Sequence, residues 1–274
     1  MRERIDSASN RKVKLAASLR QKKYREKEGL FLAEGVRLCE MAAHSGWGIL
    51  FGLYTEAALA DERARNLLEE LEERGCRIHA VPEGVFAKAS ATDSPQGVLL
   101  VLEQKKSTLE ECVGKSSSPL LMVLDGIQDP GNAGTMIRTA DAAGVDGVIL
   151  LEGSADVFAD KTVRATMGSL FHLLVCTDAS PAEFLEFARR RDIQLYAAAL
   201  DGTAMAYHMA DFSGKTAVIF GNEANGIGEG LLEAARNIYI PMFGRAESLN
   251  VSAAAAVVVY EAVRQRRLAS PKFR

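Results

Sequence analysis

The residues best suited to chemistry lie in three glycine-containing stretches in the second half of the chain. One of them, residues 240–262, reads IPMFGRAESLNVSAAAAVVVYEA and enters a long apolar helix through a polar cluster. Its polar side chains are Arg245, Glu247, Ser248, Asn250 and Ser252. Glycine and other small residues let the backbone approach a ligand closely, so that backbone N–H and C=O groups can bind it. The four alanines that follow allow another segment to pack tightly against the helix.

Two further stretches follow apolar strands and add an amide, a guanidinium and a carboxylate. Residues 124–144, LDGIQDPGNAGTMIRTADAAG, place Asn132 where it can cap a helix and Arg138 six residues further along. Helical side chains lean toward the N-terminus, so the long side chain of Arg138 can reach back over the first turn. Residues 218–230, VIFGNEANGIGEG, place Glu223 immediately after a strand, where a carboxylate can bind or orient a partner.

The residue types missing from these stretches restrict the reaction. The stretches contain neither a Ser-His-Asp set nor a Walker lysine loop, and they lack cysteine and histidine. Covalent catalysis is therefore disfavoured, and a group transfer driven by positioning fits better. The glycines of residues 226–230 fit the GxGxxG pattern poorly, which disfavours a nicotinamide-dependent dehydrogenase. The histidines and cysteines elsewhere show no metal-ligand spacing and no CxxC pair, so we expect neither a bound metal nor disulfides.

The three stretches are expected to meet because strands and helices alternate from residue 119 onward. Such alternation predicts a mainly parallel sheet with helices on both faces, and ligands bind beyond the carboxyl ends of its strands. The expected strands are residues 120–124, 147–151, 170–176, 193–200, 217–221 and 238–241. The expected helices are residues 132–144, 159–167, 181–190, 228–235 and 249–267.

The first part of the chain predicts a small α/β domain at residues 1–105. Its expected strands are residues 30–33, 49–54, 77–81 and 98–102, and its expected helices are residues 36–44 and 61–74. Asp61 can cap the second helix and Gly75 can stop it. A polar stretch with little periodicity and three serines predicts a linker at residues 106–118, which leaves residues 119–274 as the second domain.

Composition and charge narrow the class of protein further. The chain has 274 residues, is 48% hydrophobic and 25% charged, and contains no apolar run near the roughly 20 residues that span a bilayer. A charged N-terminus without a signal-peptide core predicts a cytoplasmic protein with no membrane partner. Residues 1–27 hold ten basic and three acidic side chains, a net +7, and the whole chain carries −3, so the rest carries −10. A cationic segment on an acidic body predicts phosphate binding, although a solvated helix face would look similar.

These stretches resemble a known enzyme family. The sequences LDGIQDPGNAGTMIRTADAAGVDGVIL, VIFGNEANGIGEG and IPMFGRAESLNVSAAAAVVVYEA are similar, in order and spacing, to the three motifs of the SpoU/TrmH family of RNA 2′-O-ribose methyltransferases, part of the SPOUT superfamily. The resemblance covers essentially the whole second half. NRKVKLAASLRQKKYREKEGLFLAEG (residues 10–35) and SPQG (residues 94–97) resemble the substrate-binding domain that often precedes it.

The resemblance implies a fold, a cofactor and partners. The implied fold is an α/β domain with a deep C-terminal trefoil knot, preceded by a small RNA-binding α/β domain. S-adenosylmethionine is the implied cofactor, and a homodimer completes the site across its interface. The implied cofactor-binding residues are Leu200, Gly202, Gly221, Asn222, Ile240, Met242, Ser248 and Leu249. The implied substrate is a ribose 2′-hydroxyl of structured RNA, which for a two-domain chain is most often ribosomal RNA.

The implied catalytic residues are Arg138, Asn132, Glu223, Ser248 and Asn250. A guanidinium stays protonated at any relevant pH, so Arg138 is expected to stabilise the developing alkoxide and clamp the adjacent phosphate rather than act as a base. The phosphate or a water would then accept the proton. Glu223 is expected to hold Asn132 or Arg138, while Ser248 and Asn250 orient the ribose or the methyl donor. The basic residues expected to bind RNA phosphates are Arg11, Lys12, Lys14, Lys22, Lys23 and Arg25.

Three alternatives stay open on the sequence. A knotted methyltransferase could act on a base nitrogen, but the pairing of Asn132 with Arg138 favours ribose. The ribose could belong to transfer RNA. A non-catalytic RNA-binding protein could also use this fold, although the intact SLNVS cluster argues against loss of activity.

Overall fold

The computed structural model describes residues 3–92, 94–114 and 116–269. Arg2 of the predicted basic segment and Lys115 of the predicted linker lie outside the described residues. The chain divides into two compact units, one of residues 1–105 with 156–171, the other of residues 106–155 with 172–274. Residues 156–171, which the sequence places in the second domain, therefore pack within the first unit.

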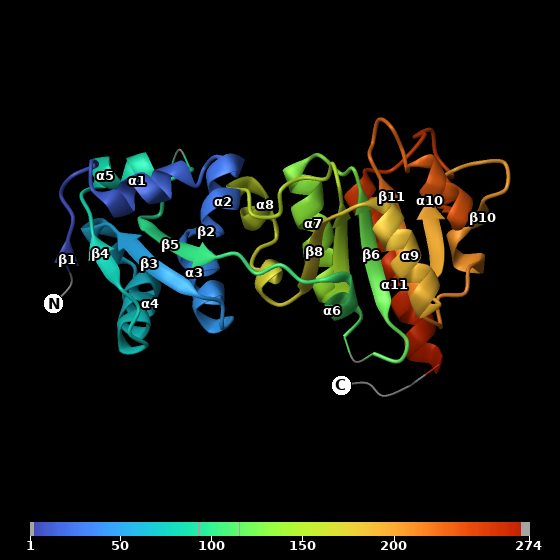
Figure 1. Cartoon of the computed structure of the whole chain (residues 1–274), viewed down its shortest axis with the longest axis horizontal. Helices are drawn as coiled ribbons and strands as arrows, with labels where there is room; N and C mark the ends of the chain where they lie inside the picture. The colour runs from blue at the N-terminus through green and yellow to red at the C-terminus, as the bar shows by residue number, and fades with distance from the viewer. Residues whose placement is uncertain (1–2, 93, 115, 270–274) are drawn as a thin grey trace. The chain divides into compact units, whose positions relative to one another are not determined.

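The first unit is a five-stranded sheet between helices. Its strands are β1 (Glu3–Arg4), β2 (Leu30–Glu34), β3 (Ile49–Tyr54), β4 (Ile78–Ala80) and β5 (Val98–Glu103). Its helical segments are α1 (Arg11–Ser18), α2 (Lys22–Glu28), α3 (Val36–His44), η1 (Glu56–Ala60), α4 (Glu62–Glu73), α5 (Glu83–Ala89), α8 (Asp160–Ala165) and η2 (Ser169–Phe171). The strand order is β1-β4-β3-β5-β2, with β5 antiparallel to both neighbours. Helices α1 and α5 lie over one face of the sheet, and α4 lies over the other (Figure 1).

Alternation along β2 explains how this sheet is covered. Leu30 and Leu32 join a buried cluster with Val13 of α1 and Phe86 of α5. Phe31, between them in sequence, packs instead against Phe158, with 5.1 Å between ring centroids. Successive strand side chains point to opposite faces, so this one strand contributes to two apolar layers.

The second unit is a seven-stranded parallel sheet with helices on both faces. Its strands are β6 (Leu120–Asp125), β7 (Gly147–Leu151), β8 (Leu174–Ala179), β9 (Gln194–Ala198), β10 (Met205–Ala206), β11 (Thr216–Gly221) and β12 (Arg236–Tyr239). Its helical segments are α6 (Leu109–Val113), α7 (Pro130–Ala143), α9 (Pro181–Arg191), η3 (Tyr207–Met209), α10 (Glu229–Ala234) and α11 (Val251–Ala269). The order is β10-β12-β9-β11-β6-β7-β8, and every strand pairing is parallel. The predicted parallel sheet covered on both faces is confirmed (Figure 1).

The strand order places a switch point at the centre of this sheet. The chain runs from β6 outward through β7 to β8, and then returns to build β9, β11 and β12 on the other side. Parallel sheets bind ligands beyond the carboxyl ends of strands at such a reversal. The carboxyl ends of β9, β11 and β12 are therefore where a site is expected.

Several predicted boundaries are wrong, and each has a local cause. The strand predicted at residues 170–176 begins only at Leu174, because Gly168, with φ of 93°, and the hydrogen bond from Phe171 N to Gly168 O form the turn of η2. The helix predicted from residue 132 begins at Pro130, capped by Asp129 and not by Asn132. The closing helix begins at Val251 rather than at residue 249.

The sequence analysis also missed several short elements. They are β1, α1, α2, η1, α5, α6, β10 and η3. Helix α6 lies inside the predicted linker, where Thr108 and Glu111 form a reciprocal capping box. No helix among the described residues is both long and apolar enough to span a bilayer.

Candidate functional site

A cavity of about 620 Å³ lies in the second unit, beyond the carboxyl ends of β9, β11 and β12. Three loops and one helix line it, and the residues that they contribute are Ala198, Ala199, Leu200, Phe220, Gly221, Asn222, Glu223, Ile238, Tyr239, Ile240, Met242, Glu247, Ser248, Leu249, Asn250, Val251, Ala254 and Val258. The wall is largely aliphatic, with backbone and a few polar side chains among it. This composition is typical of sites for small organic ligands, whose volumes are roughly 300–1,000 Å³.

The loop after β11 folds back so closely that it requires glycine. A Cβ on Gly221 would lie 2.4 Å from the backbone of Gly226, a separation that no side chain can adopt. Gly226 itself has φ of 70°, the left-handed region that glycine favours. Asn222 fixes the turn, because its Oδ1 accepts hydrogen bonds from Ala224 N at 2.8 Å and Asn225 N at 3.1 Å. The glycines of this motif therefore shape the cavity wall.

The same loop is tied to the loop that follows β6. Asn222 Nδ2 donates to the carbonyl of Gly126 at 2.8 Å. Asp125, the last residue of β6, accepts at Oδ2 from Gly228 N at 2.8 Å. These two bonds hold together the ends of neighbouring strands, so the first and second sequence motifs share one edge of the sheet.

One residue from each of the three motifs meets in a hydrogen-bonded chain. Asn132 Nδ2 donates to Glu223 Oε1, and Asn250 Nδ2 donates to Asn132 Oδ1 at 3.0 Å. Of the two partners expected for Glu223, Asn132 or Arg138, the structure has Asn132. Glu223 and Asn250 line the cavity, whereas Asn132 is not among its lining residues.

The start of α11 orients the amide of Asn250. The Oδ1 of Asn250 accepts hydrogen bonds from the backbone N of Ser252 at 2.9 Å and from the Ser252 hydroxyl at 2.6 Å. These bonds cap the helix. Because the oxygen is committed to the helix, the Nδ2 group is the one that faces Asn132. The amide orientation thus follows from the hydrogen-bond pattern.

Most of the predicted cofactor-binding residues line this cavity. They are Leu200, Gly221, Asn222, Ile240, Met242, Ser248 and Leu249. Gly202 is not among the lining residues. Arg138 lies on the exposed side of α7, outside the lining, and none of the hydrogen bonds or ion pairs resolved between residues 3–92, 94–114 and 116–269 involves it. Within one chain, the structure therefore does not bring Arg138 to the cluster around Asn132.

The sequence analysis missed Asp201, which anchors the loop after β9. Asp201 accepts hydrogen bonds from Thr203 N at 2.7 Å, from the Thr203 hydroxyl at 2.9 Å and from the amide of Asn237 on β12. These bonds, those from Thr203 first, lower the pKa of Asp201. The Asp-Gly-Thr sequence after a strand is a turn signal that could have identified it.

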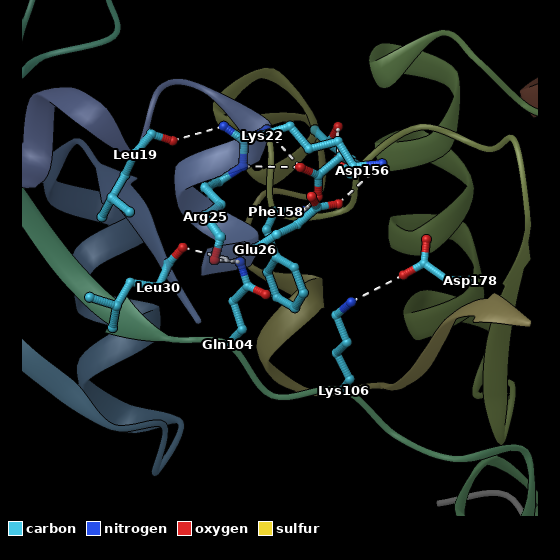
Figure 2. Close-up of polar contacts among 11 residues, drawn as sticks. Leu19, Lys22, Arg25, Glu26, Leu30, Gln104, Lys106, Asp156, Phe158 and Asp178 are labelled. Atoms are coloured by element: carbon cyan, nitrogen blue, oxygen red, sulfur yellow. Dashed lines mark hydrogen bonds and ion pairs between the residues drawn. The ribbon is translucent and has the colours of Figure 1, made fainter. Parts of the chain in front are cut away.

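The basic residues at the start of the chain do not all have the same environment. Arg11, Lys14, Lys22 and Lys23 are exposed and Lys12 is half-buried. Arg25 is only 4% exposed, and Figure 2 shows its guanidinium between Leu19 and Asp156. It donates to Leu19 O at 2.8 Å and from Nε and Nη2 to Asp156 Oδ2 at 3.0 and 2.6 Å.

Arg25 therefore corrects the expectation that all six basic side chains face RNA. Its guanidinium joins α2 to the start of the 156–171 segment and has a structural role. RNA binding by the other five stays a prediction. Among the described residues, no group of three or more His, Cys, Asp or Glu side chains could hold a metal ion.

Comparison with known protein families also divides the chain into two parts, each of which matches a different family model. Residues 119–260 match the family model of the SpoU rRNA Methylase family, and residues 10–100 match the MRM3-like substrate binding domain. The chain is 38% identical to the 23S rRNA (guanosine(2553)-2′-O)-methyltransferase RlmP of Bacillus subtilis, over 94% of this chain and 98% of the relative. It is 32% identical to the 23S rRNA (uridine(2479)-2′-O)-methyltransferase of Streptomyces viridochromogenes, over 96% of this chain and 92% of that protein.

A solved structure extends the similarity to the fold. The AdoMet-bound rRNA methyltransferase from Sinorhizobium meliloti superposes with a TM-score of 0.85 at 34% identity, covering 96% of this chain and 97% of that one. The similarity therefore spans both units and includes a protein that binds S-adenosylmethionine (AdoMet).

Proposed function

The chain belongs to the SpoU rRNA methylase family, and we propose that it transfers a methyl group from S-adenosylmethionine to a ribose 2′-hydroxyl of ribosomal RNA. The observation that carries this proposal is the cavity of about 620 Å³ beside the Asn132–Glu223–Asn250 chain. Relatives that cover nearly the whole chain are named 23S rRNA 2′-O-methyltransferases, which supports ribosomal over transfer RNA. One of these relatives is named for a guanosine and the other for a uridine, so we propose the 2′-hydroxyl as the target without a particular base.

The cavity fits S-adenosylmethionine in size and chemistry. The aliphatic side chains of Leu200, Ile240 and Leu249 suit the faces of an adenine ring, and the backbone near Gly221 supplies polar partners at close range. When bound, the cofactor supplies a methyl group already activated on a sulfonium. The protein must then place the ribose oxygen about 3–3.5 Å from that methyl carbon and provide for the proton.

We assign these tasks to the residues of the three motifs. Asn132, held from both sides, and Ser248 orient the ribose, while Glu223 fixes the amide of Asn132. Arg138 stabilises the alkoxide and clamps a neighbouring phosphate, because a guanidinium stays protonated and cannot act as a base. A phosphate oxygen or water accepts the proton. Gly202 remains a proposed cofactor contact through the loop that Asp201 anchors.

The proposed fold includes a trefoil knot and a homodimer. The C-terminal stretch, residues 240–258, lines the same cavity as the loops after β9 and β11, as a segment threaded between them would. Val257 and Tyr260 of α11, which are 36% and 49% exposed, lie on an outward stripe of a helix that packs against α7. Arg138 is exposed on α7 itself. We therefore propose that a second copy covers the α7–α11 layer and that the site is completed there.

The proposed setting is the cytoplasm, where ribosomal RNA is accessible. There, Arg11, Lys12, Lys14, Lys22 and Lys23 of α1 and α2 would bind RNA phosphates. A transfer RNA substrate, or RNA binding without catalysis, are the competing functions.

The test is methyl transfer from labelled S-adenosylmethionine to unmodified 23S rRNA and, separately, to transfer RNA. We expect the label in 23S rRNA, at one 2′-oxygen. Arg138→Ala should lower the rate by at least about 100-fold, the scale for loss of one group that stabilises developing negative charge, while S-adenosylmethionine still binds. Arg189→Ala, an exposed arginine on α9, should act like the wild type.

Each alternative result removes a defined part of the proposal. Label in transfer RNA alone would reject the ribosomal substrate, and no transfer to either RNA would favour the binding protein. Full activity of Arg138→Ala would remove Arg138 from the mechanism.

A further inference from the structure

A second cavity, of about 360 Å³, lies entirely within the first unit. Three separate segments line it: the β2–α3 junction, the loop before β5, and the end of α8 with the turn after it. Its volume falls in the range of roughly 300–1,000 Å³ for ligand sites. Neither the candidate methyl-transfer site nor the basic residues of α1 and α2 contribute to it.

A fixed carboxylate forms the most buried polar part of this cavity. Glu34 is 8% exposed and accepts three hydrogen bonds: from the Ser90 hydroxyl at 2.6 Å, from the Thr92 hydroxyl at 2.5 Å and from Ala91 N at 2.9 Å. A carboxylate offers about four acceptor positions, so one remains on Oε2. Gln96 accepts from Val36 N at 3.0 Å through Oε1, and no hydrogen bond resolved among the described residues uses its amide N–H groups. The cavity thus presents a donor and an acceptor side by side.

Two guanidinium groups belong to the same lining. Arg37 is exposed at the start of α3 and takes part in no hydrogen bond or ion pair resolved among the described residues. Arg164 uses one Nη1 donor on Asp160 at 2.9 Å, so most of its five N–H groups stay available. Two arginines at a cavity edge provide a site for a phosphate.

The third wall is apolar and its backbone is strained. Met167 lines the cavity, is 40% exposed and has φ of 51°, a left-handed conformation that is rare for residues other than glycine. Gly168 follows with φ of 93°, and a Cβ there would lie 2.2 Å from the sulfur of Met41. Glycine at this position therefore lets Met41 pack closely beside the turn that carries Met167. Strain of this kind persists chiefly where the surroundings enforce it, and it clusters at binding sites.

From this arrangement we propose that the cavity binds one unpaired nucleotide of the RNA substrate, with its base between Met167 and the Glu34–Gln96 edge and its phosphate on Arg37 and Arg164. Unpaired bases are recognised in this way, through an apolar face and a hydrogen-bonding edge, whereas in a duplex the faces are stacked and the Watson–Crick edges are paired. The inference rests on RNA as the substrate of the proposed function, and it adds a site that selects single-stranded RNA.

The test is fluorescence anisotropy of the full-length protein with labelled 12-nucleotide single-stranded RNAs and with a 12-base-pair RNA duplex, each at several salt concentrations. Arg37→Gln and Arg164→Gln should weaken single-strand binding on the order of three- to tenfold and lower the salt slope by about one. The matched control is Arg65→Gln, an exposed arginine on α4, which should bind like the wild type.

A second pair of variants tests the cavity itself. Ser94→Trp puts an indole into the cavity, whereas Ser94→Ala leaves the cavity open. We expect weaker single-strand binding from the first variant only, with unchanged duplex binding in both. Thermal unfolding checks the fold, and if Ser94→Trp does not fold, the arginine variants decide the question.

The proposal is overturned if Arg37→Gln binds single strands as tightly as the wild type, or if it weakens duplex binding equally. It is also overturned if free nucleoside 5′-monophosphates bind as tightly as the oligomers, because the cavity would then serve a free nucleotide. The outcomes are independent of catalysis. If oligomer binding depends on Arg37 but no methyl transfer occurs, the proposed function is rejected and the proposed nucleotide site is retained. If methyl transfer occurs but oligomer binding does not depend on Arg37, only the proposed nucleotide site is rejected.

Discussion

The amide of Asn132 occupies a position between two loops that leaves it a single orientation. It donates to Glu223 and accepts from Asn250, and the Oδ1 of Asn250 is itself committed to the start of α11. Each group in the chain of hydrogen bonds therefore fixes the next one. A site of this kind is preorganised, so that little reorganisation is needed when a ribose binds.

Reversing the donor and the acceptor tests this coupling. Asn132→Asp removes the donor and places two carboxylates together, so we expect methyl transfer to fall on the order of tenfold or more. Adding Glu223→Gln restores a donor opposite the introduced carboxylate and should recover part of the rate. Rates and unfolding free energies of the two single variants and the double variant form a cycle with an expected coupling of about 0.5–1 kcal/mol. Strictly additive effects would mean that the two residues act independently.

The carboxylate of Asp201 predicts how cofactor binding depends on pH. Its pKa is lowered by hydrogen bonds from Thr203 and then from Asn237, so the charged form is the one that holds the loop. A carboxyl with a lowered folded-state pKa contributes fully at neutral pH and loses its contribution as the pH falls through that value. S-adenosylmethionine affinity, measured by calorimetry, should therefore stay constant down to about pH 5 and fall only below about pH 4. Asp201→Ala should weaken binding about three- to tenfold already at pH 7, whereas a variant that binds normally would separate the loop from the cofactor.

At the scale of elements, the last turns of α11 close the second unit by hydrogen bonding. Arg266 donates from Nε to Phe212 O at 2.8 Å and from its Nη groups to the carbonyls of Ser118, Pro119 and Gly214. Burial lowers the pKa of Arg266, and the negative charge of Asp146 partly offsets this decrease. One guanidinium thus satisfies carbonyls from two separate segments and holds the C-terminal helix to them.

Replacing this guanidinium should destabilise the second unit. Arg266→Met keeps much of the aliphatic stem but removes the donor to the carbonyls of Ser118 and Phe212, whereas those of Pro119 and Gly214 keep a hydrogen bond from Thr216. We therefore expect the free energy of unfolding to fall by about 1–3 kcal/mol. Denaturant unfolding measures this, with Arg267→Met as the matched control, since Arg267 is exposed on the same turn. Equal stability of the two variants would show that water replaces the lost donors at no cost.

The long elements of the second unit could be predicted because their residues carry strong periodic signals. The apolar runs of β6 and β7 stand within one residue of their predicted bounds. Helices α1, α2, α5 and α6 were missed because five to eight residues give only a weak amphipathic pattern, although α8 and α10, with six residues each, were predicted. The polar residues of α6 look like a linker until Thr108 and Glu111 are seen to cap each other. The turn at Gly168 depends on packing against Met41, which lies far away in the sequence.

At the scale of the whole molecule, some contacts of the candidate functional residues could be predicted from the sequence and others could not. Strand-end motifs meet because a parallel sheet brings its carboxyl ends to one edge, so the contact between Asn132 and Glu223 could be predicted. The buried state of Arg25 could not, because its partner Asp156 lies 131 residues further along the chain. Arg138 remains exposed on α7, where the proposed second copy would cover it.

This arrangement predicts that two defective variants complement each other. Arg138→Ala leaves the cavity intact, and Ala254→Phe fills the cavity but leaves Arg138 intact. If each cavity uses the arginine of the other copy, a mixed dimer contains one complete site, and equal mixing after subunit exchange should restore roughly a quarter of wild-type activity. The measurement is methyl transfer to 23S rRNA, with sedimentation to verify that both variants remain dimers. If Arg138 serves its own cavity, no mixture contains a complete site and activity stays at the level of the separate variants.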